Sequence, residues 1–344
     1  MPPSSRIPPL LQPYTALPTQ DSIVLTTSTL GASSNWLLIR FLCEALGRTS
    51  SSYDENKNDN ADTKVILVSW MRDWEFWKSE ARKGGGLDLE RLKREGRLAW
   101  VDGVGGIFLP ETKETDTAKA TIPEVTTRPA RTIIPTRGPA PGRGGPAGAA
   151  ISTAVPKAHS PISQTVIPVS GSFTLRNATL PHLRETIKSA LQYLHPGPLN
   201  HSSPSQTQPR TLLVLDTPSL LLAAHPGITP SSLSATIMTL HTLTTHILLH
   251  IPADDALLSL STPPQPLEID ARNFLVKMAH VSERVLACRV LDTGVARDVS
   301  GVVRITGGRD GNGEEEEERG RGREFLYRVG GDGGVRVFER GAGG

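Results

Sequence analysis

Short apolar runs recur along the chain, and each is about as long as a β-strand. The clearest are residues 22–26, 64–69, 211–216 and 245–251. A run that is apolar at nearly every position, as in residues 64–69, indicates a strand of a parallel sheet covered on both faces. Segments with helical periodicity, such as residues 36–46 and 181–194, lie between these runs. The pattern predicts an α/β fold with a mostly parallel sheet flanked by helices.

The segment after the first run occupies the position of a phosphate-binding loop. The run 211–216 ends in Asp216, the arrangement that holds Mg²⁺ in many P-loop ATPases. A working loop needs several glycines, a lysine for the phosphate charge and a hydroxyl for the metal. Residues 27–35 contain one glycine, Gly31, the hydroxyls of Ser33 and Ser34, and no lysine. We therefore expect a degenerate phosphate loop, with no cofactor, no metal and no catalytic residues.

Two roles remain open for each polar residue of this region. Asp216 is either a remnant Mg²⁺ ligand or a turn or helix-cap residue before Thr217 and Pro218. Ser33 and Ser34 either replace the metal-binding hydroxyl or cap the following helix. Without a lysine opposite Asp216, we favour the structural roles and keep the alternative that Asp216 contacts a nucleotide bound by a neighbour.

The last third of the chain changes its pattern. Phe274, Leu275 and Met278 predict a short helix. Residues 284–291 and 301–306 form a predicted hairpin, and residues 325–329 and 335–338 add two edge strands. An α/β sheet that ends in an antiparallel extension is typical of RecA-like domains. We predict one such domain over residues 21–344, after a flexible N-terminus at residues 1–20.

Three segments without periodicity interrupt the predicted domain. They are a disordered insertion at residues 110–170 and polar loops at residues 195–210 and 307–322. The insertion is rich in Pro, Gly and Ala, and it carries spaced arginines that include Arg128 and Arg131. These arginines either attract RNA or belong to a solvated linker. The acidic run 314–318 fits a solvated loop.

Composition excludes several classes of protein. The net charge of +2 gives no strong overall attraction to nucleic acid. The two cysteines, Cys43 and Cys288, lie in apolar segments, so we expect core residues and no disulfide framework or cysteine-based zinc site. His246 and His250 are four residues apart, but on a strand, so we predict no metal there. With neither a secretory signal nor an apolar run of membrane length, we expect a soluble protein.

Three tryptophans share helical spacing. Trp70, Trp74 and Trp77 either belong to the core, fill a subunit interface or stack on RNA bases, and we favour core or interface. Arg297 lies in the predicted hairpin loop 292–300. It either reaches a neighbouring subunit or RNA, or pairs with Asp292 or Asp298.

Three segments resemble the Elongator complex protein 6 family. The first is residues 65–103, which end in Leu-Lys-Arg-Glu-Gly-Arg-Leu-Ala-Trp-Val-Asp-Gly. The second is residues 212–221. The third is residues 289–301, which read Arg-Val-Leu-Asp-Thr-Gly-Val-Ala-Arg-Asp-Val-Ser-Gly. The resemblance covers most of the predicted domain. The insertion and the acidic run depart from it at loop positions, where RNA contacts would lie.

The resemblance implies an accessory role. Members of this family form a hexameric ring with Elongator subunits four and five, and the ring binds tRNA and docks on the catalytic Elongator subcomplex that modifies the wobble uridine. It implies a location in the cytoplasm, with a nuclear fraction as an open alternative. Arg297, Arg128 and Arg131 are then candidate tRNA or subunit contacts. The alternatives are an ATP-hydrolysing RecA-like subunit with an unconventional nucleotide site, or a RecA-like regulator outside Elongator.

Overall fold

The computed structural model describes residues 6–47, 63–108, 170–196, 210–259, 261–294, 296, 298–307 and 322–339. The described strands form one ten-stranded sheet in the order β10-β9-β8-β7-β1-β6-β5-β2-β3-β4. The strands are β1 (Ser22–Ser28), β2 (Lys64–Ser69), β3 (Leu98–Asp102), β4 (Ser172–Thr174), β5 (Thr211–Asp216), β6 (His246–Pro252), β7 (Arg284–Arg289), β8 (Gly301–Gly307), β9 (Arg323–Val329) and β10 (Val335–Glu339).

Strand direction divides the sheet into two parts. Strands β7, β1, β6, β5, β2, β3 and β4 are mutually parallel. Strands β8, β9 and β10 continue the same sheet in antiparallel pairing beyond β7. The predicted parallel sheet and its C-terminal antiparallel extension are both confirmed.

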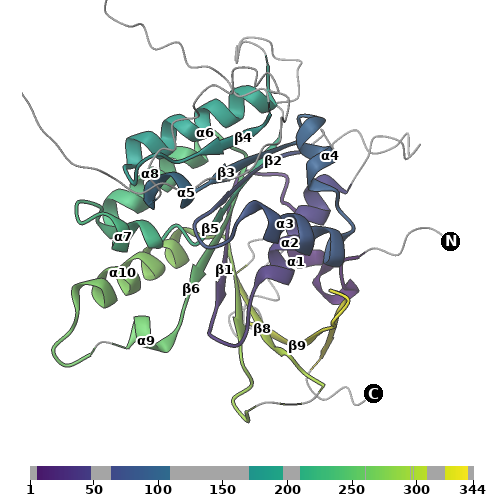
Figure 1. The fold of residues 1–344 in the computed structure, drawn as a ribbon. Helices are drawn as coiled ribbons and strands as arrows, with labels where there is room; N and C mark the ends of the chain where they lie inside the picture. The colour runs from purple at the N-terminus through teal and green to yellow at the C-terminus, as the bar shows by residue number, and fades with distance from the viewer. Residues whose placement is uncertain are drawn as a thin grey trace, which may run out of the picture. The chain divides into compact units, whose positions relative to one another are not determined.

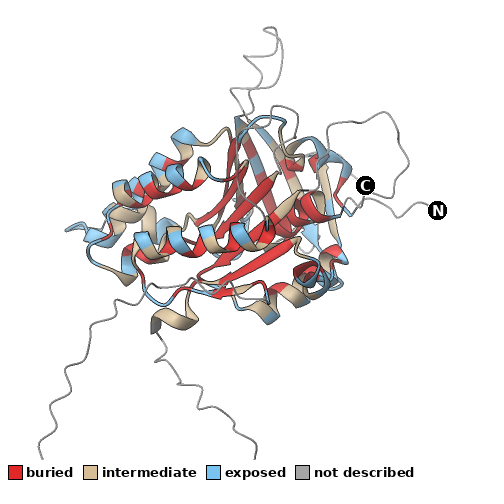
Figure 2. Ribbon diagram, turned by 90° about the horizontal axis from the view of Figure 1, so that it is seen from above, coloured by how far each residue is buried: buried red, intermediate tan, exposed pale blue. Residues whose placement is uncertain are grey.

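Helices cover both faces of the parallel part (Figure 1). The described helical segments are η1 (Pro9–Leu11), α1 (Gln12–Thr15), α2 (Asn35–Leu46), α3 (Trp74–Glu80), η2 (Ala81–Gly85), α4 (Leu89–Arg94), α5 (Gly105–Phe108), α6 (Leu180–Leu194), α7 (Leu220–Ala224), α8 (Pro230–His241), α9 (Asp255–Leu258) and α10 (Pro266–Val281). One core cluster joins a sheet face to α2, α3 and α4, and the other joins the opposite face to α6, α8 and α10. Figure 2 shows the buried strands between helices whose outer surfaces are exposed.

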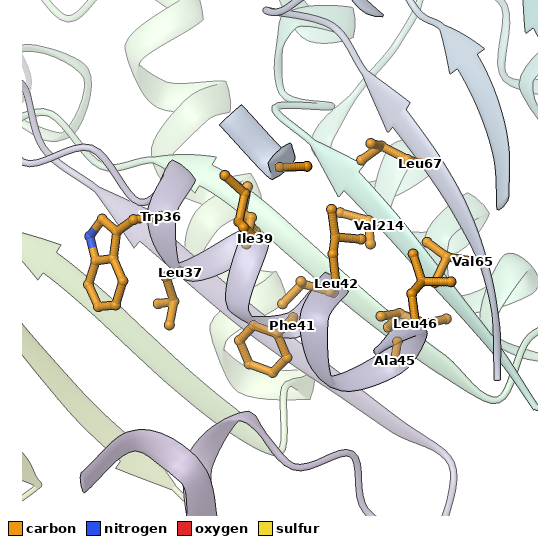
Figure 3. Packing of buried hydrophobic residues seen from close by; sticks show 14 of the residues in the cluster. Trp36, Leu37, Ile39, Phe41, Leu42, Ala45, Leu46, Val65, Leu67 and Val214 are labelled. Carbon is orange, nitrogen blue, oxygen red and sulfur yellow. The ribbon is translucent and has the colours of Figure 1, made fainter. Parts of the chain in front are cut away.

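Helix α2 is buried on nearly all sides. Apolar residues fill most of its positions, and Figure 3 shows Leu42 and Leu46 close to Val214 and Val65 of the sheet. On its other side, Trp36 packs on Tyr327 of β9 with ring centroids 4.7 Å apart. An all-round apolar helix needs partners on every side. The antiparallel extension and the N-terminal segment supply those on the side away from the parallel strands.

Two sequence expectations need correction. Residues 1–20 do not behave as a flexible tail throughout, because residues 9–15 form η1 and α1 and Leu11 is fully buried. The short helix expected around Phe274 and Met278 is a sixteen-residue helix, α10, whose start carries a capping box between Gln265 and Glu268. The insertion 110–170 and the loops 195–210 and 307–322 lie almost entirely outside the described residues. In the described part of the chain, none of the helices combines the length and apolar character required to cross a membrane.

Candidate functional site

The carboxyl ends of β1, β6, β5 and β2 meet at one edge of the sheet. Ligands of open α/β sheets bind at this kind of edge. Strand β6 lies between β1 and β5. The strand that precedes the predicted phosphate loop, β1, is therefore not adjacent to the strand that ends in Asp216, β5. The register places His250 beside Asp216, and Asp216 beside Ser69. Three polar side chains of neighbouring strands therefore share the sheet face that α2 covers.

Asp216 is fully buried and is held by side chains of the β2 end. The Ser69 hydroxyl donates to its Oδ2 at 2.7 Å. The Arg72 guanidinium donates to both carboxylate oxygens at 2.9 Å, and its side chain is 20% exposed. The Arg72 backbone N–H in turn donates to Ser69 Oγ at 3.0 Å, which fixes the loop after β2 against the carboxylate.

His250 and Thr217 complete the surroundings of the carboxylate. His250 Nδ1 lies 2.8 Å from Asp216 Oδ1, and the Thr217 hydroxyl donates to the same oxygen at 3.2 Å. On the other side of the ring, Ser28 Oγ lies 2.9 Å from His250 Nε2. The Nδ1–H of His250 donates to Asp216, and the ring forms its second hydrogen bond, at Nε2, with the Ser28 hydroxyl. A continuous hydrogen-bonded chain therefore crosses from β1 through β6 to β5.

The protonation of Asp216 follows from these contacts. Burial favours the neutral acid and acts to raise the pKa of Asp216. The hydrogen bond and charge of His250, the charge of Arg72 and the hydrogen bond from Ser69 outweigh burial, and the pKa is lowered. The carboxylate is therefore ionised at neutral pH and accepts hydrogen bonds on both of its oxygens.

The backbone is unusual next to this carboxylate. Thr217 has a φ of 64°, a left-handed conformation that is uncommon for a β-branched residue. Its N–H donates to the His250 carbonyl at 3.0 Å, and its hydroxyl lies close to both Asp216 and His250. Strained conformations of this kind persist where surrounding contacts over-determine them.

The order Ser28, His250, Asp216 is also that of nucleophile, base and orienting acid in serine hydrolases. Ser28 differs in its setting, because it lies within β1 and is paired in register with Pro252 of β6 and Cys288 of β7. The carboxylate differs as well, because Arg72 shares it with the histidine. We therefore interpret the chain of hydrogen bonds as a structural link between β1, β6 and β5, and not as the catalytic triad of a hydrolase.

The degenerate phosphate loop is a closed turn. The Ala32 N–H donates to the Thr29 carbonyl at 2.9 Å, and Gly31 adopts a φ of 87°. A Cβ added at Gly31 would lie 3.1 Å from Val290 Cγ1, so the turn also rests on the residue after β7. The Leu30 N–H donates to the Asp254 carboxylate, which leaves this amide unavailable to a phosphate.

The serines of the loop differ from each other. Ser33 Oγ accepts from the Asn35 N–H at 3.2 Å, in agreement with a capping role. Ser34 occupies the N-cap position of α2 without a side-chain capping bond, and its buried Oγ has no hydrogen-bond partner among the residues that the structure describes. The loop therefore retains a buried hydroxyl beside the start of α2, although the lysine is missing.

The three tryptophans have different settings. Trp77 is fully buried and Trp70 is 2% exposed, so the core role, one of the alternatives left open above, fits both residues. Trp74 is half-buried, packs on Trp100 at 5.5 Å between centroids and donates from its ring N–H to Glu90 at 3.0 Å. Among these rings, Trp74 is the one that still reaches the surface.

Arg297, Arg128 and Arg131 lie outside the described residues. The two carboxylates that we considered as partners of Arg297 have other arginines beside them. Asp292 pairs with Arg289, and Asp298 pairs with Arg328 at 3.0 Å.

Four residues of the Asp216 cluster, Ser28, Ser69, Arg72 and His250, were not predicted as site residues. Arg72 follows β2 by three positions, and His250 was considered from the sequence only as a metal ligand. A usable signal existed for His250, because it stands near the end of an apolar run, as Asp216 does. Polar residues at the carboxyl ends of adjacent parallel strands meet at one edge.

The parallel sheet with helices on both faces and the antiparallel extension define a RecA-like domain. Among solved structures, the chain is similar to an uncharacterized protein from Pyrococcus horikoshii in complex with an unknown peptide, with 9% identity, a TM-score of 0.50 and coverage of 97% of this chain and 98% of that one. A KaiC-like protein from Pyrococcus horikoshii OT3 aligns with 11% identity and a TM-score of 0.49, over 97% of both chains. No protein-family model and no curated protein matches the sequence. These similarities concern the fold alone.

Proposed function

We propose that this chain is a non-catalytic RecA-like subunit of the Elongator accessory ring, and that it supports tRNA binding and wobble-uridine modification through assembly. Its partners would be Elongator subunits four and five, the catalytic Elongator subcomplex and, through the assembled ring, tRNA. The proposal rests on the three segments that resemble the Elongator complex protein 6 family and on the state of Asp216. The RecA-like fold is compatible with it.

The hydrogen bonds that Asp216 accepts from protein side chains are the main support for a non-catalytic role. A carboxylate offers about four acceptor sites on its two oxygens. Ser69, Arg72, Thr217 and His250 together make five close contacts with them. A Mg²⁺ ligand needs an oxygen that faces the metal, and Arg72 adds a positive charge where the cation would lie. Residues 27–35 also contain no lysine. Phosphoryl transfer would therefore lack both the Mg²⁺ ion and the lysine that stabilise the phosphate charge.

Exposed apolar side chains at the same edge support an assembly role. Leu30 is 88% exposed, Met71 57% and Val290 47%, and they follow β1, β2 and β7 at their carboxyl ends. Large apolar side chains that protrude from one edge are typical of interaction surfaces. We propose that this edge packs against a neighbouring RecA-like subunit.

Affinity purification of the tagged chain from its own cells, with mass-spectrometric identification of partners, tests the proposal. Elongator subunits four and five should be recovered in amounts comparable to the tagged chain. Leu30→Asp should reduce their recovery roughly tenfold, as expected for a central interface residue. Leu243→Asp is the matched control, because Leu243 is 39% exposed and lies just before β6, at the opposite edge. Absence of both partners from the wild-type sample would refute the Elongator assignment.

The alternative function is nucleotide hydrolysis at the loop after β1, and the unpartnered Ser34 hydroxyl is the observation that favours it. ATP turnover by the assembled ring should not change when Ser33 and Ser34 of this subunit are both replaced by Ala. These substitutions leave the Asp216 network intact, whereas Asp216→Ala would also disturb folding. A large drop in turnover would favour the enzyme over the accessory subunit.

A further inference from the structure

A basic hollow lies on the surface, away from the Asp216 cluster. The N-terminal segment 6–9, α2, η2 and the turn between β9 and β10 surround it, and its volume is about 360 Å³. Small-molecule sites begin at about this size. Its charged lining consists of Arg6, Arg40, Lys83 and Asp332.

Arg40 forms the fixed wall of the hollow. Its side chain rises from α2 and is 2% exposed. One terminal nitrogen donates to the Gly84 carbonyl at 2.5 Å, and the other donates to the Gly333 carbonyl at 3.1 Å. The buried Nε finds no hydrogen-bond partner in the described ranges. Neutral carbonyls orient this guanidinium, and within the described part of the chain no carboxylate neutralises it.

Arg6 and Lys83 supply the accessible charges. Both are exposed, and neither forms an ion pair with any residue that the structure describes. The Arg6 guanidinium lies directly over Gly86, which has a φ of 60°, and a Cβ at that position would overlap it. Glycine at position 86 therefore gives Arg6 its position at the hollow.

Asp332 does not balance these charges. Its Oδ1 accepts from the Gly334 N–H at 3.0 Å, so the carboxylate is used within the turn between β9 and β10. Three cations then face one carboxylate. Burial, with a smaller contribution from the charge of Arg6, lowers the pKa of Arg40 against the opposing effect of Cys43. An anion in the hollow would reduce the repulsion between the positive charges of Arg6, Arg40 and Lys83.

We propose that the hollow binds a phosphate group, carried either by RNA or by a free phosphate ligand. Arginine and lysine are the side chains that most often bind phosphate. Arginine presents its donors in a planar fork that matches the phosphate oxygens. Arg6 and Lys83 make the direct contacts, and Arg40 contributes a preorganised charge behind them. The proposal is independent of ring membership, because a single chain builds the hollow.

Two binding measurements on the purified full chain, or on its complex with its partners, test the proposal. The probes are inorganic phosphate, followed by calorimetry, and transfer RNA, followed by fluorescence anisotropy at several salt concentrations. Lys83→Glu and Arg6→Glu are the test variants, and both positions are exposed, so folding should be preserved. Arg94→Glu is the matched control, because Arg94 is an exposed arginine of α4 and does not line the hollow.

Each test variant should weaken binding of at least one probe on the order of tenfold, and the control should not. If transfer RNA responds, the plot of log affinity against log salt should also become less steep by about one unit per lost contact. The probe that responds identifies the source of the phosphate. Equal affinities of wild type and test variants for both probes, or no binding of either, would overturn the proposal. Neither result affects the recovery of partners, so the two proposals fail separately.

Discussion

Replacement of Asp216 by Asn tests whether the buried carboxylate is a structural element. The amide is nearly the same size, but it removes the negative charge that Arg72 and His250 face at 2.9 and 2.8 Å. It also turns one acceptor into an NH₂ group that points at donors. Removing one partner of a buried ion pair costs about 3–5 kcal/mol. Because Arg72 is 20% exposed and water can partly solvate it, we expect the lower end of this range, about 3 kcal/mol.

The assay is urea denaturation followed by tryptophan fluorescence, since the chain has 5 tryptophans. Asp298→Asn is the matched control. Asp298 is paired with Arg328 at 3.0 Å, but the two side chains are 77% and 51% exposed. Exposed pairs contribute less than about 1 kcal/mol, so this control should change the unfolding free energy little. A loss below about 1 kcal/mol for Asp216→Asn would refute the structural role and return Asp216 to the candidates for ligand binding.

The pH dependence gives an independent check on the same residue. The pKa of Asp216 is lower in the folded chain than in the unfolded one. Its stabilising effect is therefore complete above the unfolded pKa of about 3.9 and is lost as the pH falls through the folded value. The stability difference between wild type and Asp216→Asn should shrink only below about pH 4.

Further predictions concern buried titratable groups. Burial and then the charge of Arg210 lower the pKa of His246 to about 4, so the unfolded chain binds a proton between pH 6.5 and 4 that the native chain does not. The unfolding free energy should therefore decrease as the pH falls from 6.5 to 4, by at most about 3 kcal/mol. His246→Gln should flatten this profile of unfolding free energy against pH. An unchanged profile in the variant would contradict this. Burial raises the pKa of the Cys288 thiol to about 12 and also raises that of Cys43. Iodoacetamide at pH 8, followed by mass spectrometry, should therefore label native Cys288 far more slowly than unfolded Cys288. Rapid labelling of native Cys288 would show that it is not buried.

The strands could be predicted from the sequence because their signal is local. The runs ending at Ser69 and Asp216 are apolar enough to specify buried parallel strands by themselves. The apolar residues Phe274 and Met278 alone predict a helix shorter than α10. The sequence signals of its true start are Pro266 and the pair Gln265 and Glu268.

The candidate site could be predicted only in part. The missing lysine and the position of Asp216 are properties of single segments. The contacts of Asp216 depend on strand order, because His250 approaches Asp216 only if β6 lies between β1 and β5. Ser28, Arg72 and His250 are far apart along the chain, and no local pattern shows that they meet. The basic hollow depends in the same way on Arg6 and Asp332, from opposite ends of the chain.

The burial of α2 on all sides has a consequence for synthesis of the chain. Its Trp36 packs on Tyr327 of β9, and its Arg40 donates to the carbonyl of Gly333, which is synthesised 293 residues after Arg40. Until then, Trp36 lacks its aromatic partner and Arg40 lacks one of its acceptors. A chain that ends before β9 would present an apolar helix surface to other proteins. Quality-control factors that bind exposed apolar helices would therefore distinguish chains that lack β9 and β10 from chains that contain them.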